Sequence, residues 1–130
     1  MEERPDVPFG STGADARISA VSDAATGAPT ALGNARDSII VMATFARGPA
    51  WSSTESLEVK LVLTGACPGI VVAAFPAPAP VVIAHQFRIT ASDIAAWCTR
   101  DGVTLARAVL LGRNARPLAA SVPMGLTIRR

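Results

Sequence analysis

The sequence predicts an all-β protein folded as a single antiparallel β-sandwich, and an immunoglobulin-like sandwich is one form of this class. After residue 37, short apolar segments rich in β-branched residues follow one another, and turns containing Gly or Pro separate them. With 130 residues, of which 50% are hydrophobic, the chain is long enough for one domain with its own core. The predicted strands are Ser38–Ala46, Ser56–Thr64, Gly69–Phe75, Val81–Ile89, Gly102–Leu111, Leu118–Val122 and Met124–Ile128.

The first predicted strands differ in which of their faces are apolar. Ser38–Ala46 is largely apolar on both faces, which is typical of a strand in the middle of a sheet. In Ser56–Thr64, Leu and Val alternate with Glu58 and Lys60, so one face is expected in the core and the other in solvent. The segment 65–69 contains Gly and Pro and predicts a turn into the next strand.

A proline-rich connection and a short helix are predicted in the second half of the chain. The segment 76–80 contains three prolines, which favour an extended, stiff crossover between two sheets. One short helix is expected near residues 91–98, with Thr90 or Ser92 as its N-cap. A longer helix through residues 92–111 is the alternative, but Gly102 and the β-branched residues after it favour a strand.

Two regions are predicted from composition. Residues 1–37, rich in Gly, Pro, Ala and Ser, predict an extended N-terminal arm, and residues 38–130 predict the β-sandwich domain. Within the arm, residues 17–22 form a short alternating segment, which is expected to be an edge strand through Ile18 and Val21.

Charge and hydropathy indicate which partners to expect. The formal net charge is only +2, and the scattered arginines do not alternate with aromatic residues, so no nucleic acid is expected as a partner. No apolar run reaches the ~18 residues of a membrane span, so no membrane partner is expected either. The mean hydropathy of +0.38 and the 17% of charged residues favour a homo-oligomer, for example a trimer.

The N-terminus and the two cysteines bear on localisation. The first residues lack the basic and apolar regions of a secretory signal, so synthesis in the cytoplasm is expected. In that compartment Cys67 and Cys98 are more readily explained as buried free thiols than as a disulfide, although a bridge is not excluded. Two cysteines alone do not supply the ligands of a zinc site, and no metal or cofactor is expected.

Catalytic chemistry has little support in the sequence. Cys67 lies in a Gly-x-Cys-x-Gly segment, but a strand follows this segment, whereas a nucleophile elbow is followed by a helix. His85, the only histidine, lies on the apolar face of its predicted strand, which favours a core or interface role. A small hydrolase using Cys67 and His85 is the weaker alternative, so the protein is expected to be non-enzymatic, with no catalytic residue.

These observations predict a structural assembly protein. The preferred form is a bacteriophage virion component, such as a capsid decoration (cement) protein, located in the virion after assembly in the host cytoplasm. Its expected partners are other copies of itself and a shell-forming protein, which the N-terminal arm and the apolar sandwich edges would contact. The candidate interface residues are Arg4, Phe9, Ile18, Trp51, Arg129 and Arg130.

Two alternative functions remain open on the sequence. The first is a ligand-binding module of the carbohydrate-binding or adhesin-like kind, in which Trp51 would be an aromatic contact; the absence of Tyr disfavours it. The second is a main shell-forming coat protein instead of a decoration protein. The sequence shows no clear helical segment for dimerisation, which favours the decoration protein.

Overall fold

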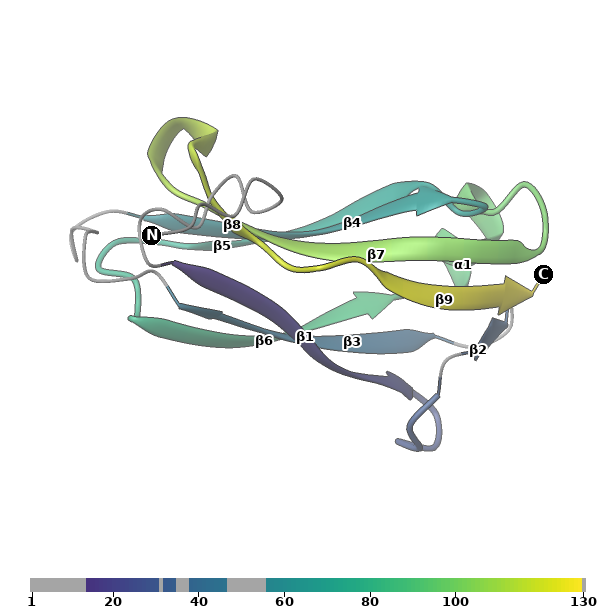
Figure 1. Cartoon of the computed structure of the whole chain (residues 1–130). Coiled ribbons are helices and arrows are strands. Elements are labelled where there is room, and N and C mark those ends of the chain that lie inside the picture. The colour runs from purple at the N-terminus through teal and green to yellow at the C-terminus, as the bar shows by residue number, and fades with distance from the viewer. Residues whose placement is uncertain (1–13, 31, 35–37, 47–55, 130) are drawn as a thin grey trace, which may run out of the picture.

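Two β-sheets packed face to face make up the computed structural model, which describes residues 14–30, 32–34, 38–46 and 56–129. In Figure 1 one sheet lies above the other, so the predicted all-β sandwich is confirmed. The three-stranded sheet has the order β1 (Asp15–Asp23), β3 (Ile39–Ala46), β6 (Val82–Ile89). The six-stranded sheet follows the path β2 (Leu32–Asn34), β9 (Met124–Arg129), β7 (Gly102–Leu111), β4 (Leu57–Gly65), β5 (Gly69–Phe75), and β8 (Pro117–Ala120) also pairs with β7.

The distribution of strands over the two sheets matches an immunoglobulin-like arrangement. The first, second and fifth long strands of the chain form one sheet, and the third, fourth and later strands form the other. This corresponds to strands A, B and E packed on strands C, F and G, with an extra strand beside C. The strands pair antiparallel except β2, which is parallel to β9.

Two segments of the predicted N-terminal arm pair with strands of the sandwich. The predicted edge strand 17–22 is confirmed as part of β1, which pairs with β3 at the margin of the three-stranded sheet. Ala16 is buried and Ile18 and Val21 pack against the core, so burial of these side chains holds β1 despite the Gly- and Pro-rich flanking sequence. An arm free of the sandwich therefore remains a prediction only for residues 1–13, which lie outside the described residues. The predicted boundary between arm and sandwich domain at residue 37 also stays a prediction.

The core lies between the inner faces of the sheets. Strand β3 contributes to the core from the middle of its sheet, as its two apolar faces predict. Phe45 of β3 and Phe87 of β6 pack edge to face in this core, with ring centroids 6.2 Å apart. The largest fully buried side chains are Phe45, Phe87, Ile39, Leu61, Ile89, Ile94, Leu110, Leu118, Leu126, Ile128, Val41 and Val59.

The connections in the second half of the chain agree with the sequence prediction. The proline-rich segment 76–80 crosses from β5 in one sheet to β6 in the other. The helix α1 (Ala91–Trp97) begins at Thr90, whose hydroxyl accepts from the Asp93 N–H while the Asp93 carboxylate accepts from the Thr90 N–H. The chain then continues as the strand β7, so the longer helix is excluded.

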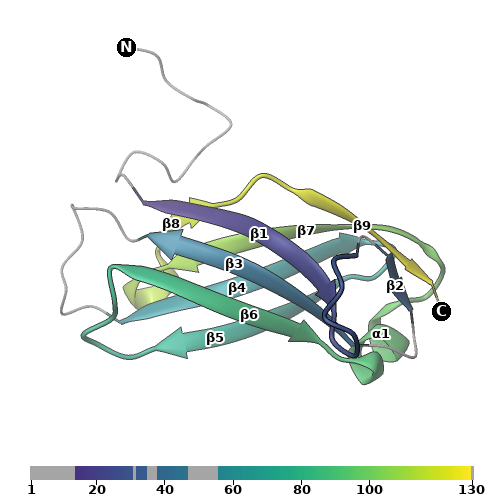
Figure 2. The same ribbon diagram turned by 90° about the horizontal axis from the view of Figure 1, so that it is seen from below.

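Helix α1 packs its last residue against the start of β5. A side-chain Cβ at Gly69 would overlap the indole ring of Trp97, so only glycine fits beside the ring. Trp97 is half-buried against the core. The helix is thereby positioned over one end of the six-stranded sheet (Figure 2).

Candidate interaction surface

The outer face of the six-stranded sheet carries exposed apolar side chains on β5 and β7, with the half-buried Val62 of β4 between them. Ile70 and Val72 of β5 are 54% and 50% exposed, and Val103 and Leu105 of β7 are 59% and 46% exposed. Val62 of β4 lies between these strands, because it is the register partner of Ile70 on β5 and of Arg107 on β7. We call these five apolar residues the apolar outer face.

Charged side chains are few on this surface. Lys60 and Glu58 lie on β4 at alternate positions and form an ion pair of 3.8 Å between Nζ and Oε1. Arg107 follows Leu105 on the same side of β7, and among the described residues it has no ion-pair partner. The surface therefore presents an apolar cluster beside the guanidinium group of Arg107, which no described carboxylate neutralises.

Strand β7 creates this surface because it points its smaller residues inward. Thr104, Ala106 and Ala108 are buried, whereas Val103 and Leu105 between them are exposed. The small inward side chains leave room for β1, which packs against β7. The apolar outer face was not predicted, because Glu58 and Lys60 indicated a polar, solvent-facing side of the sheet; the high mean hydropathy was the available signal.

The sequence-predicted interface residues are not gathered on this surface. Ile18 of β1 is half-buried and packs against the core, so its apolar character has a structural explanation. Arg129 ends β9 with an exposed side chain on the six-stranded sheet. Arg4, Phe9, Trp51 and Arg130 lie outside the described residues, and their roles stay predictions.

A shallow pocket of about 600 Å³ lies at one end of the sandwich, where β4 and β5 meet the turn after β7. Leu57, Phe75 and Pro76 line it together with Asn114, and Glu58 is the one ionisable group among its described lining residues. Glu58 is already paired with Lys60. The other polar side chains of this lining are Ser56 and Asn114, so it offers few polar groups to orient a small molecule.

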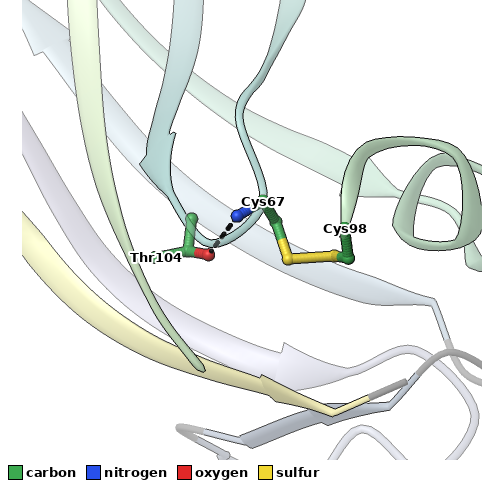
Figure 3. Close-up of a disulfide and its surroundings, with 3 residues drawn as sticks. All are labelled: Cys67, Cys98 and Thr104. Atoms are coloured by element: carbon green, nitrogen blue, oxygen red, sulfur yellow. Dashed lines mark hydrogen bonds between the residues drawn. A yellow bond between two sulfur atoms is a disulfide. The ribbon is translucent and has the colours of Figure 1, made fainter. Parts of the chain in front are cut away.

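The cysteines form a disulfide, which corrects the preference for free thiols. Cys67 in the β4–β5 turn is bonded to Cys98, the C-cap of α1 (Figure 3). Beside the bridge, the buried Thr104 hydroxyl accepts a hydrogen bond of 3.1 Å from the Cys67 N–H. The expectation failed because it rested on the assumed reducing compartment, whereas the fold brings the two buried cysteines together across 31 residues of sequence.

Cys67 and His85 do not come together as a catalytic pair. Cys67 is held in the disulfide next to the start of β5. The His85 ring lies on the inner side of β6 between Phe87, at 4.7 Å, and Phe75, at 5.8 Å between centroids. Phe75 is the last residue of β5, so the imidazole contacts the end of that strand opposite to Cys67.

The stability of the protein is expected to fall on acidification because of His85. Burial lowers the pKa of the His85 imidazole below its ordinary value of 6.5, since desolvation disfavours the charged ring. As the pH falls through 6.5 the unfolded chain takes up this proton before the folded chain does, so stability decreases from there down to the folded-state pKa. Thermal melts at about pH 7.5 and about pH 5.5 measure the loss.

The matched variant for this measurement is His85→Phe, which keeps an aromatic ring between Phe75 and Phe87. We expect it to lose less stability than the unsubstituted protein over the same interval. Because His85 is the only histidine, equal losses in both proteins would assign the pH dependence to carboxylates instead.

The fold and surface together define a disulfide-containing β-sandwich with an apolar outer face. No protein-family model matches the sequence, and no curated protein matches it either. Among the described residues no helix has the length and hydropathy needed to cross a membrane. In the same part of the chain, no three His, Cys, Asp or Glu side chains gather where they would hold a metal ion.

Proposed function

We propose that this chain is a non-enzymatic structural protein of a larger assembly, and that it binds a neighbouring subunit through the apolar outer face. The observation that carries the proposal is the exposure of four large aliphatic side chains on β5 and β7, each about half accessible. Single exposed apolar residues are ordinary on protein surfaces, but here two pairs lie on either side of β4 with the half-buried Val62 between them, and a grouping of this kind indicates an interaction site.

The size of this surface favours an assembly with several contacts. Covering these four side chains would remove on the order of 300 Å² of apolar area from water, worth about 8 kcal/mol before costs. The loss of translational and rotational freedom on association costs about 4–15 kcal/mol. One such contact alone is therefore weak, whereas many copies bound to one particle, each using more than one contact, gain from effective concentration.

The chemistry of the surface also defines its partner. An apolar protein surface would cover Ile70, Val72, Val103 and Leu105, and a carboxylate on that partner would pair with Arg107. Arginine is favoured at such interfaces because its guanidinium binds carboxylates through two hydrogen bonds and is weakly hydrated. A shell-forming subunit with this surface is the occupant we propose.

In its most specific form, the proposal places the chain on a bacteriophage virion as a capsid decoration protein. The Cys67–Cys98 disulfide supports service in an oxidising environment, because such bonds persist on secreted proteins and virion surfaces. Since β1 and β2 pair with the sandwich, an arm contact with a neighbouring subunit is proposed only for residues 1–13.

Particle sedimentation tests the proposal with a matched pair of variants. Leu105→Lys places a charge in the middle of the apolar outer face, and Val122→Lys makes the same change at an 80% exposed apolar residue in the β8–β9 connection. Tagged chain is expressed during phage infection and the particles are purified on a gradient. We expect Leu105→Lys to reduce the chain in the particle fraction roughly tenfold and Val122→Lys to leave it unchanged.

Two results would contradict this proposal. Unsubstituted chain that stays at the top of the gradient is not a particle component, and the virion assignment then fails. If both variants remain with the particles, the apolar outer face is not the contact.

A further inference from the structure

The sheet edges of this sandwich differ in how well they are protected. In the three-stranded sheet, β1 has a register shift between Ile18 and Ala20 and the exposed charges Asp15 and Arg17, and β6 carries the exposed Arg88. In the six-stranded sheet, β2 has only three residues. Bulges, charges and short length are the devices that prevent edge strands from pairing with other chains.

Strand β5 has none of these devices. Its seven residues, Gly69–Phe75, include no charged residue and no proline, and they pair with β4 in one continuous register. β5 is the last strand of its sheet, and it lies beside β6 at the margin of the sandwich (Figure 2). An unblocked apolar edge of this kind is a template for strand addition.

We propose that β5 of one copy pairs antiparallel with β5 of a second copy, so that two six-stranded sheets join into one. A two-fold axis at Val72 would place Val72 opposite its own counterpart and Ile70 opposite Ala74. On the inner side, Val71 would lie opposite Ala73. Because the strand has no charge, these cross-strand pairs bring no like charges together.

The partial burial of β5 supports this choice of surface. Its inward residues Val71, Ala73 and Phe75 are only half-buried, because the three-stranded sheet ends at β6 and leaves this margin incompletely covered. Pairing of two copies would continue the row of apolar side chains across the junction. Each copy would thus supply apolar neighbours for the half-buried side chains at the margin of the other copy.

A second copy of β5 fits this edge better than the N-terminal segment does. Residues 1–13 contain Pro5 and Pro8, which cannot donate hydrogen bonds, together with three acidic residues. The β5 strand of a second copy instead supplies an apolar strand of the same length as the edge it pairs with, and it carries no charge.

The pairing of two β5 strands deepens the proposed function, because it would join the apolar outer faces of two copies. Its biological role, the binding of a particle, rests on that proposed function. Ile70 and Val72 of both copies would lie at the centre of one continuous apolar outer face, which presents two contacts to a particle. The pairing itself is measurable on the purified chain without any partner. A failure of the pairing is therefore distinguishable from a failure of the particle attachment.

Cross-linking with two matched cysteine variants tests the geometry. Val72→Cys and Val103→Cys replace valines of similar exposure, 50% and 59%, on the same face of the same sheet. Val72 is on the edge strand, whereas Val103 is on the interior strand β7. With the native cysteines held in their disulfide, we expect a short bismaleimide to join Val72→Cys into covalent dimers and to leave Val103→Cys monomeric.

Sedimentation velocity with lysine variants at the same two positions tests the strength of the pairing. We expect Val72→Lys to weaken the dimer roughly tenfold or more and Val103→Lys to leave it unchanged. Cross-linking of both cysteine variants would indicate stacking of the faces and would overturn the edge pairing. A monomeric unsubstituted chain at every concentration tested would overturn it as well, even where the particle attachment persists.

Discussion

Replacing Cys67 and Cys98 together by alanine is expected to lower the free energy of unfolding by about 3–4 kcal/mol. The disulfide closes a loop of 31 residues in sequence separation, so it removes conformational freedom from the unfolded chain. It also joins the β4–β5 turn to the end of α1, two segments that belong to different parts of the chain. Urea unfolding of the double variant and the unsubstituted protein measures the difference.

Reduction provides the control for this prediction. A phosphine reductant, added under unfolding conditions where the buried bridge becomes accessible, should lower the stability of the unsubstituted protein to nearly that of the double variant. The double variant should not respond. If the two proteins unfold at the same urea concentration without reductant, the disulfide does not contribute to stability.

Replacing Phe87 by alanine is expected to cost about 3–5 kcal/mol of stability. The Phe87 side chain is fully buried and packs edge to face against both Phe45 and His85. Alanine would remove these contacts and leave a cavity between the sheets, because a packed core relaxes only in part. The measurement is again the free energy of unfolding in urea.

Phe75→Ala is the matched control for the core substitution. Phe75 also packs edge to face against His85, but it is half-buried at the end of the edge strand β5. Removing this ring exposes less new surface and leaves an opening to solvent instead of a closed cavity, so its cost should be clearly smaller. Equal costs for the two variants would show that the core between the two sheets is no better packed than the margin at β5.

The strands and the helix were predictable because their signals are local. Alternation in residues 57–64 reports a half-buried strand whatever the rest of the chain does, and the apolar faces of 38–46 identified β3 as a central strand. The N-cap candidates Thr90 and Ser92 placed the start of α1 within two residues for the same reason, and the structure shows that Thr90 is the cap. The edge strand within 17–22 was also recognised, although its pairing with β3 was not.

The candidate surface was not predictable from the same patterns. Period-two alternation in β7 separates Val103 and Leu105 from Thr104, Ala106 and Ala108, but hydrophobicity alone assigns the larger residues to the core. The structure places the smaller set inside, where β1 packs across β7 and the Thr104 hydroxyl accepts from Cys67. The orientation of β7 was therefore decided by the room that β1 needs on its inner side and by the hydrogen bond between Thr104 and Cys67.

The sequence by itself determined that this protein is a β-sandwich with one short helix, because strand alternation, turn residues and helix caps act between near neighbours in the chain. Only the tertiary structure decided that Cys67 meets Cys98, that part of the N-terminal region completes both sheets, and that β5 ends one of them. These features depend on pairs of segments far apart in sequence. Local patterns carry no information about which distant segments pack together, so the surfaces available to a partner emerged only with the assembled sheets.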